Sequence, residues 1–130
     1  MVQVKAHIAQ QHYATTVSTA TNTLVADEPV ANGGTAAGMA PEELLGASLA
    51  SCTAITLRMY ADRKGFALTD IEVNVAITRD AAQGTTVMER HITLQGALTD
   101  EERNRLLTIA NKCPIHKILS GQVTIKTDIV

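Results

Sequence analysis

Residues 41–65 read PEELLGASLASCTAITLRMYADRKG, and this stretch carries several signals of one helix. Pro41 suits the first position of a helix, and the carboxylates of Glu42 and Glu43 suit the positive end of the helix dipole. Gly65 is typical of the position just after a helix ends. The stretch therefore predicts a helix from Pro41 to Lys64, about 36 Å long at 1.5 Å per residue. So long an element overshoots a single domain of 130 residues.

Strands are predicted on both sides of this helix. Before it, apolar residues alternate with polar ones from Val2 to Ile8, and the Thr-rich segment that follows predicts antiparallel strands as far as Pro29. Residues 31–40, ANGGTAAGMA, are predicted to form a loop. After the helix, alternation from Ile71 to Thr78 and a second run at 85–96 predict a hairpin with Gly84 in its turn.

The last third of the chain is predicted to contain two helices and a strand. Thr99 and Glu102 have the spacing of a capping box, which indicates a helix that runs to about Lys112. Pro114 predicts a kink or a new short helix up to Gly121, and residues 123–130, VTIKTDIV, predict a final strand. The chain is thus predicted to be one α+β domain over residues 1–130.

Composition excludes several classes of function. Aromatic residues make up 2% of the chain and the formal net charge is -2, so neither stacking platforms nor a basic surface for nucleic acid is expected. The first residues contain no apolar core of a signal peptide, and the uncharged stretch from Leu44 to Leu57 is too short to span a bilayer. We expect a cytoplasmic protein, in which the two cysteines are free, redox-active or metal-binding rather than joined by a structural disulfide.

Cys52 lies within the long helix, where Leu45, Leu49, Cys52, Thr56 and Met59 recur at helical spacing. This spacing predicts that the thiol lies on an apolar face. A small buried hydrophobic residue is the ordinary interpretation of such a cysteine.

Cys113 differs because it stands between two predicted helices and directly before Pro114. Backbone N–H groups at such a position can lower the pKa of a thiol. Cys113 and His116 also have a spacing that could bind zinc, but a structural site needs four ligands and the remaining candidates are scattered, so we expect no metal. The loop GGTAAGM lacks the Lys and Ser or Thr of a phosphate-binding loop, so we expect no nucleotide cofactor.

Two segments together carry a family resemblance. GMAPEELLGASLASCTAITLRMYADRKG, at 38–65, and ANKCPIHKIL, at 110–119, resemble the OsmC-like family, which includes the organic hydroperoxide resistance proteins. The resemblance implies an intertwined homodimer with antiparallel sheets around long central helices, which would supply a partner for the overlong helix. It also implies thiol peroxidase activity with organic hydroperoxides as substrates, hydrogen peroxide as a second candidate, and a dithiol reductant of the lipoyl type.

The resemblance also assigns roles to single residues. Cys52 matches the peroxidatic cysteine, Cys113 the resolving cysteine, and Glu42 the acid that pairs with an active-site arginine. In the peroxide-resistance proteins that arginine comes from the N-terminal strands, but this chain has no arginine before Arg58. Arg90 shares the strand phase of Ile92 and is our candidate for the missing cation, although a side chain reaching solvent at a sheet edge explains the same pattern.

Two hypotheses remain open from the sequence. The first is a cysteine-based peroxidase that needs no cofactor, in which a Cys52 sulfenic acid condenses with Cys113 to a disulfide. The second is a protein on the same scaffold that binds a small ligand or senses redox state without catalysis. Retention of both cysteines and Glu42 favours the enzyme, whereas the missing upstream arginine favours the alternative.

Overall fold

The computed structural model describes residues 1–130, which divide into two compact units, Met1–Leu45 and Gly46–Val130. Each unit has its own antiparallel sheet. The helix α1, Pro41–Lys64, begins in the first unit and continues through the second.

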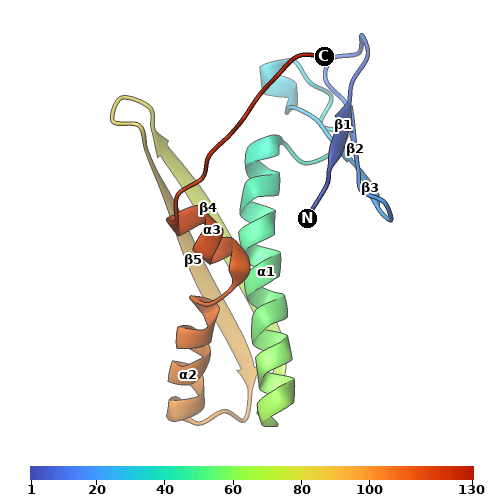
Figure 1. Ribbon diagram of the computed structural model, residues 1–130. Helices are drawn as coiled ribbons and strands as arrows, with labels where there is room; N and C mark the ends of the chain where they lie inside the picture. The colour runs from blue at the N-terminus through green and yellow to red at the C-terminus, as the bar shows by residue number, and fades with distance from the viewer. The chain divides into compact units, whose positions relative to one another are not determined.

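The first unit contains a three-stranded sheet in the order β1-β2-β3 (Figure 1). Its strands are β1 (Lys5–His7), β2 (Thr15–Ser18) and β3 (Thr23–Ala26), and a single 3-10 turn, η1 (Val30–Asn32), follows them. Both strand pairs are antiparallel. The predicted N-terminal strands are confirmed.

The carboxylate of Asp27 organises the loop that follows β3. It is 2% exposed and accepts hydrogen bonds from the backbone N–H groups of Tyr13, Glu28, Thr35 and Ala37 and from the Thr35 hydroxyl. The Thr35 hydroxyl is the strongest influence on its pKa; together with the backbone donors it outweighs burial and holds the pKa of Asp27 well below its usual range. The predicted loop at 31–40 is therefore ordered around one buried charge.

The bounds of α1 agree with the predicted helix. Glu42 and Glu43 lie in its first turn, Arg63 and Lys64 in its last, and Gly65 follows with a φ of 71°. By length and composition alone α1 could also cross a membrane, a weak indication because the core helix of a globular protein passes the same test.

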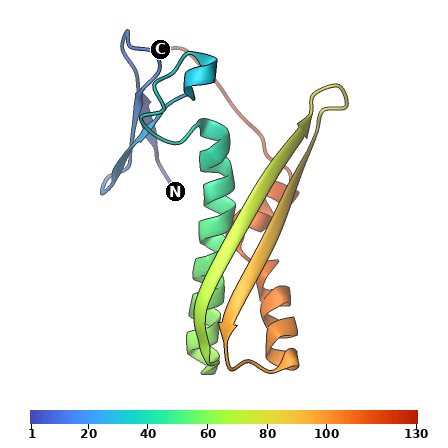
Figure 2. The ribbon, with the colours of Figure 1, turned by 180° about the vertical axis from the view of Figure 1, so that it is seen from behind.

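The second unit is a long hairpin with helices on one face. The hairpin consists of β4 (Leu68–Asp80) and β5 (Thr85–Gly96), joined by a turn in which Gly84 has a φ of 66°. Figure 2 shows α1 and α2 (Asp100–Ala110) lying behind the same face of this hairpin. The core between them is aliphatic apart from Tyr60, and its buried members are Leu57, Tyr60, Ala61, Leu68, Leu106, Ile109 and Ala110.

Both predicted C-terminal helices are present. The capping box at α2 is complete, since the Thr99 hydroxyl accepts from the Glu102 N–H and the Glu102 carboxylate accepts from the Thr99 N–H. The last helix, α3, spans Pro114–Ser120.

The predicted C-terminal strand is wrong for this chain. Residues 122–130 form no strand, and Val123, Ile125 and Ile129 are 60%, 84% and 98% exposed. A strand needs a neighbouring strand to satisfy its N–H and C=O groups, and the alternating pattern alone does not supply one.

The buried stripe of α1 also differs from the predicted face. Its members are Gly46, Leu49, Thr53, Leu57, Tyr60 and Ala61, whereas Leu45 and Met59 are 42% and 68% exposed. Cys52 is half-buried and precedes the fully buried Thr53, so it lies at the margin of the stripe. This position keeps one side of the cysteine open.

Candidate functional site

Cys113 occupies the N-cap position of α3, where the chain turns between two helices. Its residue is 0% exposed, and its sulfur accepts a hydrogen bond from the His116 N–H at 3.3 Å. Pro114 follows as the first residue of α3. The predicted placement of this thiol beside a backbone donor is confirmed.

The second unit brings the two cysteines together as free thiols. The side chain of Cys52 hydrogen-bonds with that of Cys113, and the Thr53 hydroxyl lies 3.9 Å from the Cys113 sulfur. Burial raises the pKa of the Cys113 thiol, but hydrogen bonds to its sulfur outweigh burial, first among them the bond from the His116 N–H and then those from the Cys52 thiol and the Ile115 backbone. The pKa of Cys113 therefore lies below its ordinary value.

Arg90 reaches this pair from the hairpin. Arg90 lies on β5, where it pairs with Val75 of β4. It belongs to the set of alternate β5 residues that are half-buried, as its spacing from Ile92 predicted. Its guanidinium makes four hydrogen bonds: to the Thr53 hydroxyl at 3.1 Å, the Ala110 carbonyl at 3.3 Å, the Asn111 side-chain oxygen at 2.8 Å and His116 Nδ1 at 3.2 Å. Arg90 is thus a bridging residue and not a side chain reaching into solvent.

Glu42 lies in the first turn of α1 and belongs to the first unit. Its pairing with Arg90 stays a prediction, and so does a thiolate-stabilising role of Arg90 toward Cys52. No group of three or more His, Cys, Asp or Glu side chains converges in a way that could hold a metal ion.

Thr53, Asn111 and His116 were not predicted as parts of this site. The only signal of His116 in the sequence is its spacing from Cys113, and that of Thr53 is its place directly after Cys52. Their shared feature is contact with Arg90, which is distant in sequence from all three. Such a contact depends on how the hairpin packs against the helices and leaves no local pattern in the sequence.

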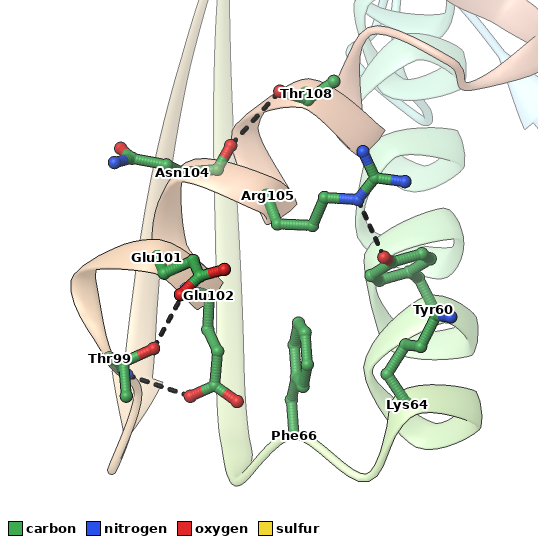
Figure 3. Close-up of a pocket in the computed structure, with 9 residues that line it drawn as sticks. All are labelled: Tyr60, Lys64, Phe66, Thr99, Glu101, Glu102, Asn104, Arg105 and Thr108. Atoms are coloured by element: carbon green, nitrogen blue, oxygen red, sulfur yellow. Dashed lines mark hydrogen bonds between the residues drawn. The ribbon is translucent and has the colours of Figure 1, made fainter.

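Two pockets of the second unit lie near these elements. One, of about 300 Å³, has apolar walls from Leu49, Met88 and Leu119 and includes His116. Another, of about 720 Å³, lies where the end of α1 faces the start of α2 and contains neither cysteine (Figure 3). There Arg105 Nε donates to the Tyr60 hydroxyl at 2.9 Å, and this bond lowers the pKa of Tyr60.

Solved structures share this fold along nearly the whole chain. An OsmC-like protein from Mycoplasma pneumoniae is 20% identical with a TM-score of 0.79, covering 93% of this chain and 88% of that one. An osmotic stress induced and detoxification response protein from Psychrobacter arcticus is 24% identical with a TM-score of 0.78, covering 91% and 88%. The organic hydroperoxide resistance protein OhrB of Bacillus subtilis is 24% identical with a TM-score of 0.63, covering 97% and 95%.

The predicted α+β fold is confirmed by these likenesses and by the antiparallel sheets and helices of the structure. No curated protein matches the sequence. Residues 33–128, which include α1, the hairpin and both cysteines, match the family model described as OsmC-like protein. The chain therefore belongs to the OsmC-like family.

Proposed function

We propose that the protein is a thiol-dependent peroxidase that reduces organic hydroperoxides through Cys52 and Cys113. The observation that carries the proposal is the contact between a half-buried thiol and a fully buried one whose pKa is lowered. Membership of the family and the structural likeness to organic hydroperoxide resistance proteins support a peroxide-related role. We favour this function over ligand binding without catalysis because the two thiols hydrogen-bond with each other, which supports a reaction between them.

Exposure divides the roles between the cysteines. A peroxide has to reach the sulfur that attacks it, and Cys52 at the margin of the buried stripe is the more accessible of the two. Cys113 is 0% exposed, which suits a thiol that reacts only with its neighbour. The pocket beside His116 offers apolar walls for the organic group of the substrate.

The first step forms a sulfenic acid on Cys52. The thiolate of Cys113 accepts the proton of the Cys52 thiol, with which it hydrogen-bonds. The Cys52 sulfur then attacks the terminal oxygen of the hydroperoxide, so that an S–O bond forms, the O–O bond breaks and the alkoxide leaves. The alkoxide takes up a proton to give the alcohol, and Cys113 becomes a thiolate again.

The second step closes a disulfide. The Cys113 thiolate attacks the sulfur of the Cys52 sulfenic acid, the S–OH bond breaks, and the departing hydroxide takes up a proton to become water. A dithiol then reduces the disulfide by exchange and is itself oxidised to a cyclic disulfide. One hydroperoxide and one dithiol are consumed for one alcohol and one water.

Consumption of cumene hydroperoxide with a small dithiol tests this function. Wild-type protein should turn over repeatedly, Cys52→Ser should be inactive, and Cys113→Ser should be oxidised without repeated turnover by this route. Ser51→Ala, an exposed neighbour of Cys52 on α1, is the matched control and should retain activity. A wild-type protein whose thiols both remain titratable after excess peroxide would refute the proposal in favour of a binding protein.

A further inference from the structure

The guanidinium of Arg90 contacts both elements that carry the cysteines. Nη1 donates to the hydroxyl of Thr53, the residue directly after Cys52 on α1. Nη1 also donates to the Ala110 carbonyl, and Nη2 donates to Asn111 Oδ1. One side chain of the hairpin therefore ties α1 to the end of α2.

The turn that carries Cys113 is held from both sides by this arginine. Ala110 and Asn111 precede the cysteine, and His116, which follows it, faces Nη2 through Nδ1 at 3.2 Å. Because a guanidinium only donates, Nδ1 is the acceptor and the histidine carries its proton on Nε2. The turn's own bond from the Cys113 N–H to the Ala110 carbonyl is long, at 3.4 Å, and the contacts of Arg90, called the clamp from here on, add hydrogen bonds to residues on both sides of the cysteine.

On α1, the Arg90 guanidinium is held by Thr53, whose own position is fixed. It is fully buried, and its hydroxyl donates to the Leu49 carbonyl at 2.7 Å, so its oxygen lone pairs are directed toward Arg90. The same hydroxyl oxygen lies 3.9 Å from the Cys113 sulfur. Anchoring Thr53 and the Cys113 turn to one rigid planar group fixes the separation of the two thiols.

We propose that Arg90, with Asn111 and His116, is a positioning residue that fixes Cys113 for closure of the disulfide. This inference rests on the proposed function and assigns Arg90 to the second step, in place of the cation for Cys52 that the sequence suggested. A disulfide forms only when the two Cα atoms lie about 4.4–6.8 Å apart with suitable direction, so a loosened turn slows closure.

Sulfenic acid formation and disulfide closure distinguish this role from charge stabilisation of Cys52, because a positioning residue affects only the closure step. In Arg90→Met, the single-turnover rate of cumene hydroperoxide consumption should change little. Closure of the disulfide should become slower on the order of tenfold to a hundredfold, because small misplacements of reacting groups reduce rates by such factors. Trapping with dimedone reports the lifetime of the Cys52 sulfenic acid, which should lengthen by the same factor. Slower consumption with normal closure would overturn the clamp and restore Arg90 as the cation for Cys52.

The conservative variant Arg90→Lys separates geometry from charge. A lysine keeps the positive charge but lacks the planar fork that reaches four acceptors, so closure should remain slow. Arg103→Met is the control: it removes an exposed arginine of α2, and its disulfide should close as fast as that of wild type. Recovery of wild-type closure in Arg90→Lys would show that charge alone suffices and would overturn the proposal.

An equilibrium measurement tests the clamp without any peroxide. In buffers of reduced and oxidised dithiothreitol, the equilibrium constant for the Cys52–Cys113 disulfide reports how well the two thiols are placed. Arg90→Met should lower this constant on the order of tenfold or more. If wild-type protein fails to react with hydroperoxide but shows this difference, the proposed function falls and the clamp stands.

Milder variants keep the test valid if Arg90→Met does not fold. Asn111→Ala and His116→Ala each remove one of the four hydrogen bonds and leave the others. Each should lengthen the sulfenic acid lifetime and lower the dithiothreitol constant by a smaller factor than Arg90→Met would. If both variants had the sulfenic acid lifetime and the dithiothreitol constant of wild type, with secondary structure intact by circular dichroism, the positioning role of Arg90 would be refuted.

Discussion

The hydroxyl of Thr53 lies 3.9 Å from the sulfur of Cys113, although 60 positions separate the two residues in the sequence. Thr53 belongs to the buried stripe of α1 and Cys113 to the turn before α3. Since Cys52 directly precedes Thr53, the packing that buries the threonine also delivers the neighbouring thiol to Cys113. The proximity of the two thiols is thus a consequence of how α1 packs.

The hydrogen bond between the two thiols should be visible in a titration of Cys113. Replacing Cys52 by alanine removes a donor to the Cys113 sulfur, so the pKa of Cys113 should rise. Thiolate absorbance at 240 nm, followed against pH, measures this shift. Cys52→Ser keeps a hydroxyl donor and should titrate at lower pH than Cys52→Ala; coincident curves for the two variants would show that Cys52 does not stabilise the Cys113 thiolate.

Oxidation should raise the stability of the second unit, which contains both cysteines. Cys113 follows Cys52 by 61 positions, and closing a loop of that length contributes about 4 kcal/mol in the entropic model when the native geometry is unstrained. Thermal unfolding of peroxide-treated and reduced protein measures the difference. Cys52→Ser serves as the control and should melt at one temperature under both conditions, whereas a lower melting temperature of oxidised wild type would show that the bridge strains the fold.

The elements with strong local signals were predictable from the sequence. The Pro41 start and Gly65 end of α1, the alternation of the hairpin and the capping box at Thr99 each depend on neighbouring residues, and the structure confirms them. The final strand depended on alternation alone. It failed because pairing is a relation between two segments, and residues 122–130 have no strand beside them.

The face of α1 was less predictable because apolar side chains surround this helix. A stripe through Leu45, Cys52 and Met59 has the same spacing as the stripe that is buried. Which one faces the core is decided by α2 and the hairpin, which pack against Leu57 and Tyr60. The contacts of Arg90 escaped prediction for the same reason, since they join a strand to residues of α1, α2 and α3.

Asp27 should make the first unit sensitive to acid. Its pKa is lowered in the folded state, so its contribution to stability is present above the ordinary value of 3.8 and is lost as the pH falls below that value toward the native pKa. Amide hydrogen exchange at Tyr13, Thr35 and Ala37, whose N–H groups bind this carboxylate, measures the effect. At neutral pH, exchange there should be faster in Asp27→Asn than in wild type.

The acid dependence provides the control for that prediction. The difference between Asp27→Asn and wild type should shrink as the pH falls, because protonation removes the charge that the substitution removes. Asp80→Asn alters an exposed carboxylate at the end of β4, which accepts from the Gln83 N–H, and should leave exchange in the first unit unchanged. Equal exchange in Asp27→Asn and wild type at neutral pH would contradict the role of Asp27.

The exposed apolar face of α1 should be buried in a homodimer. Ile55 and Met59 are 54% and 68% exposed, and a groove of about 470 Å³ adjoins them between α1 and the start of β4. Burying a fully exposed side chain of this size contributes about 1.5–3 kcal/mol, so these partly exposed side chains contribute roughly half to two-thirds of that each, and each would be buried twice in a symmetric dimer. Light scattering at micromolar concentration should therefore give twice the mass of one 13.8 kDa chain.

Charged substitutions on this face should separate the subunits. The double variant Ile55→Glu with Met59→Glu should raise the dissociation constant on the order of a hundredfold or more, because each carboxylate would have to lose its water in the interface. Ala81→Glu with Ala82→Glu adds the same charge at the exposed hairpin turn and should remain dimeric. A wild-type protein that is monomeric at micromolar concentration would contradict the intertwined dimer. A dimer unaffected by the glutamates at 55 and 59 would place its interface on another surface of the chain.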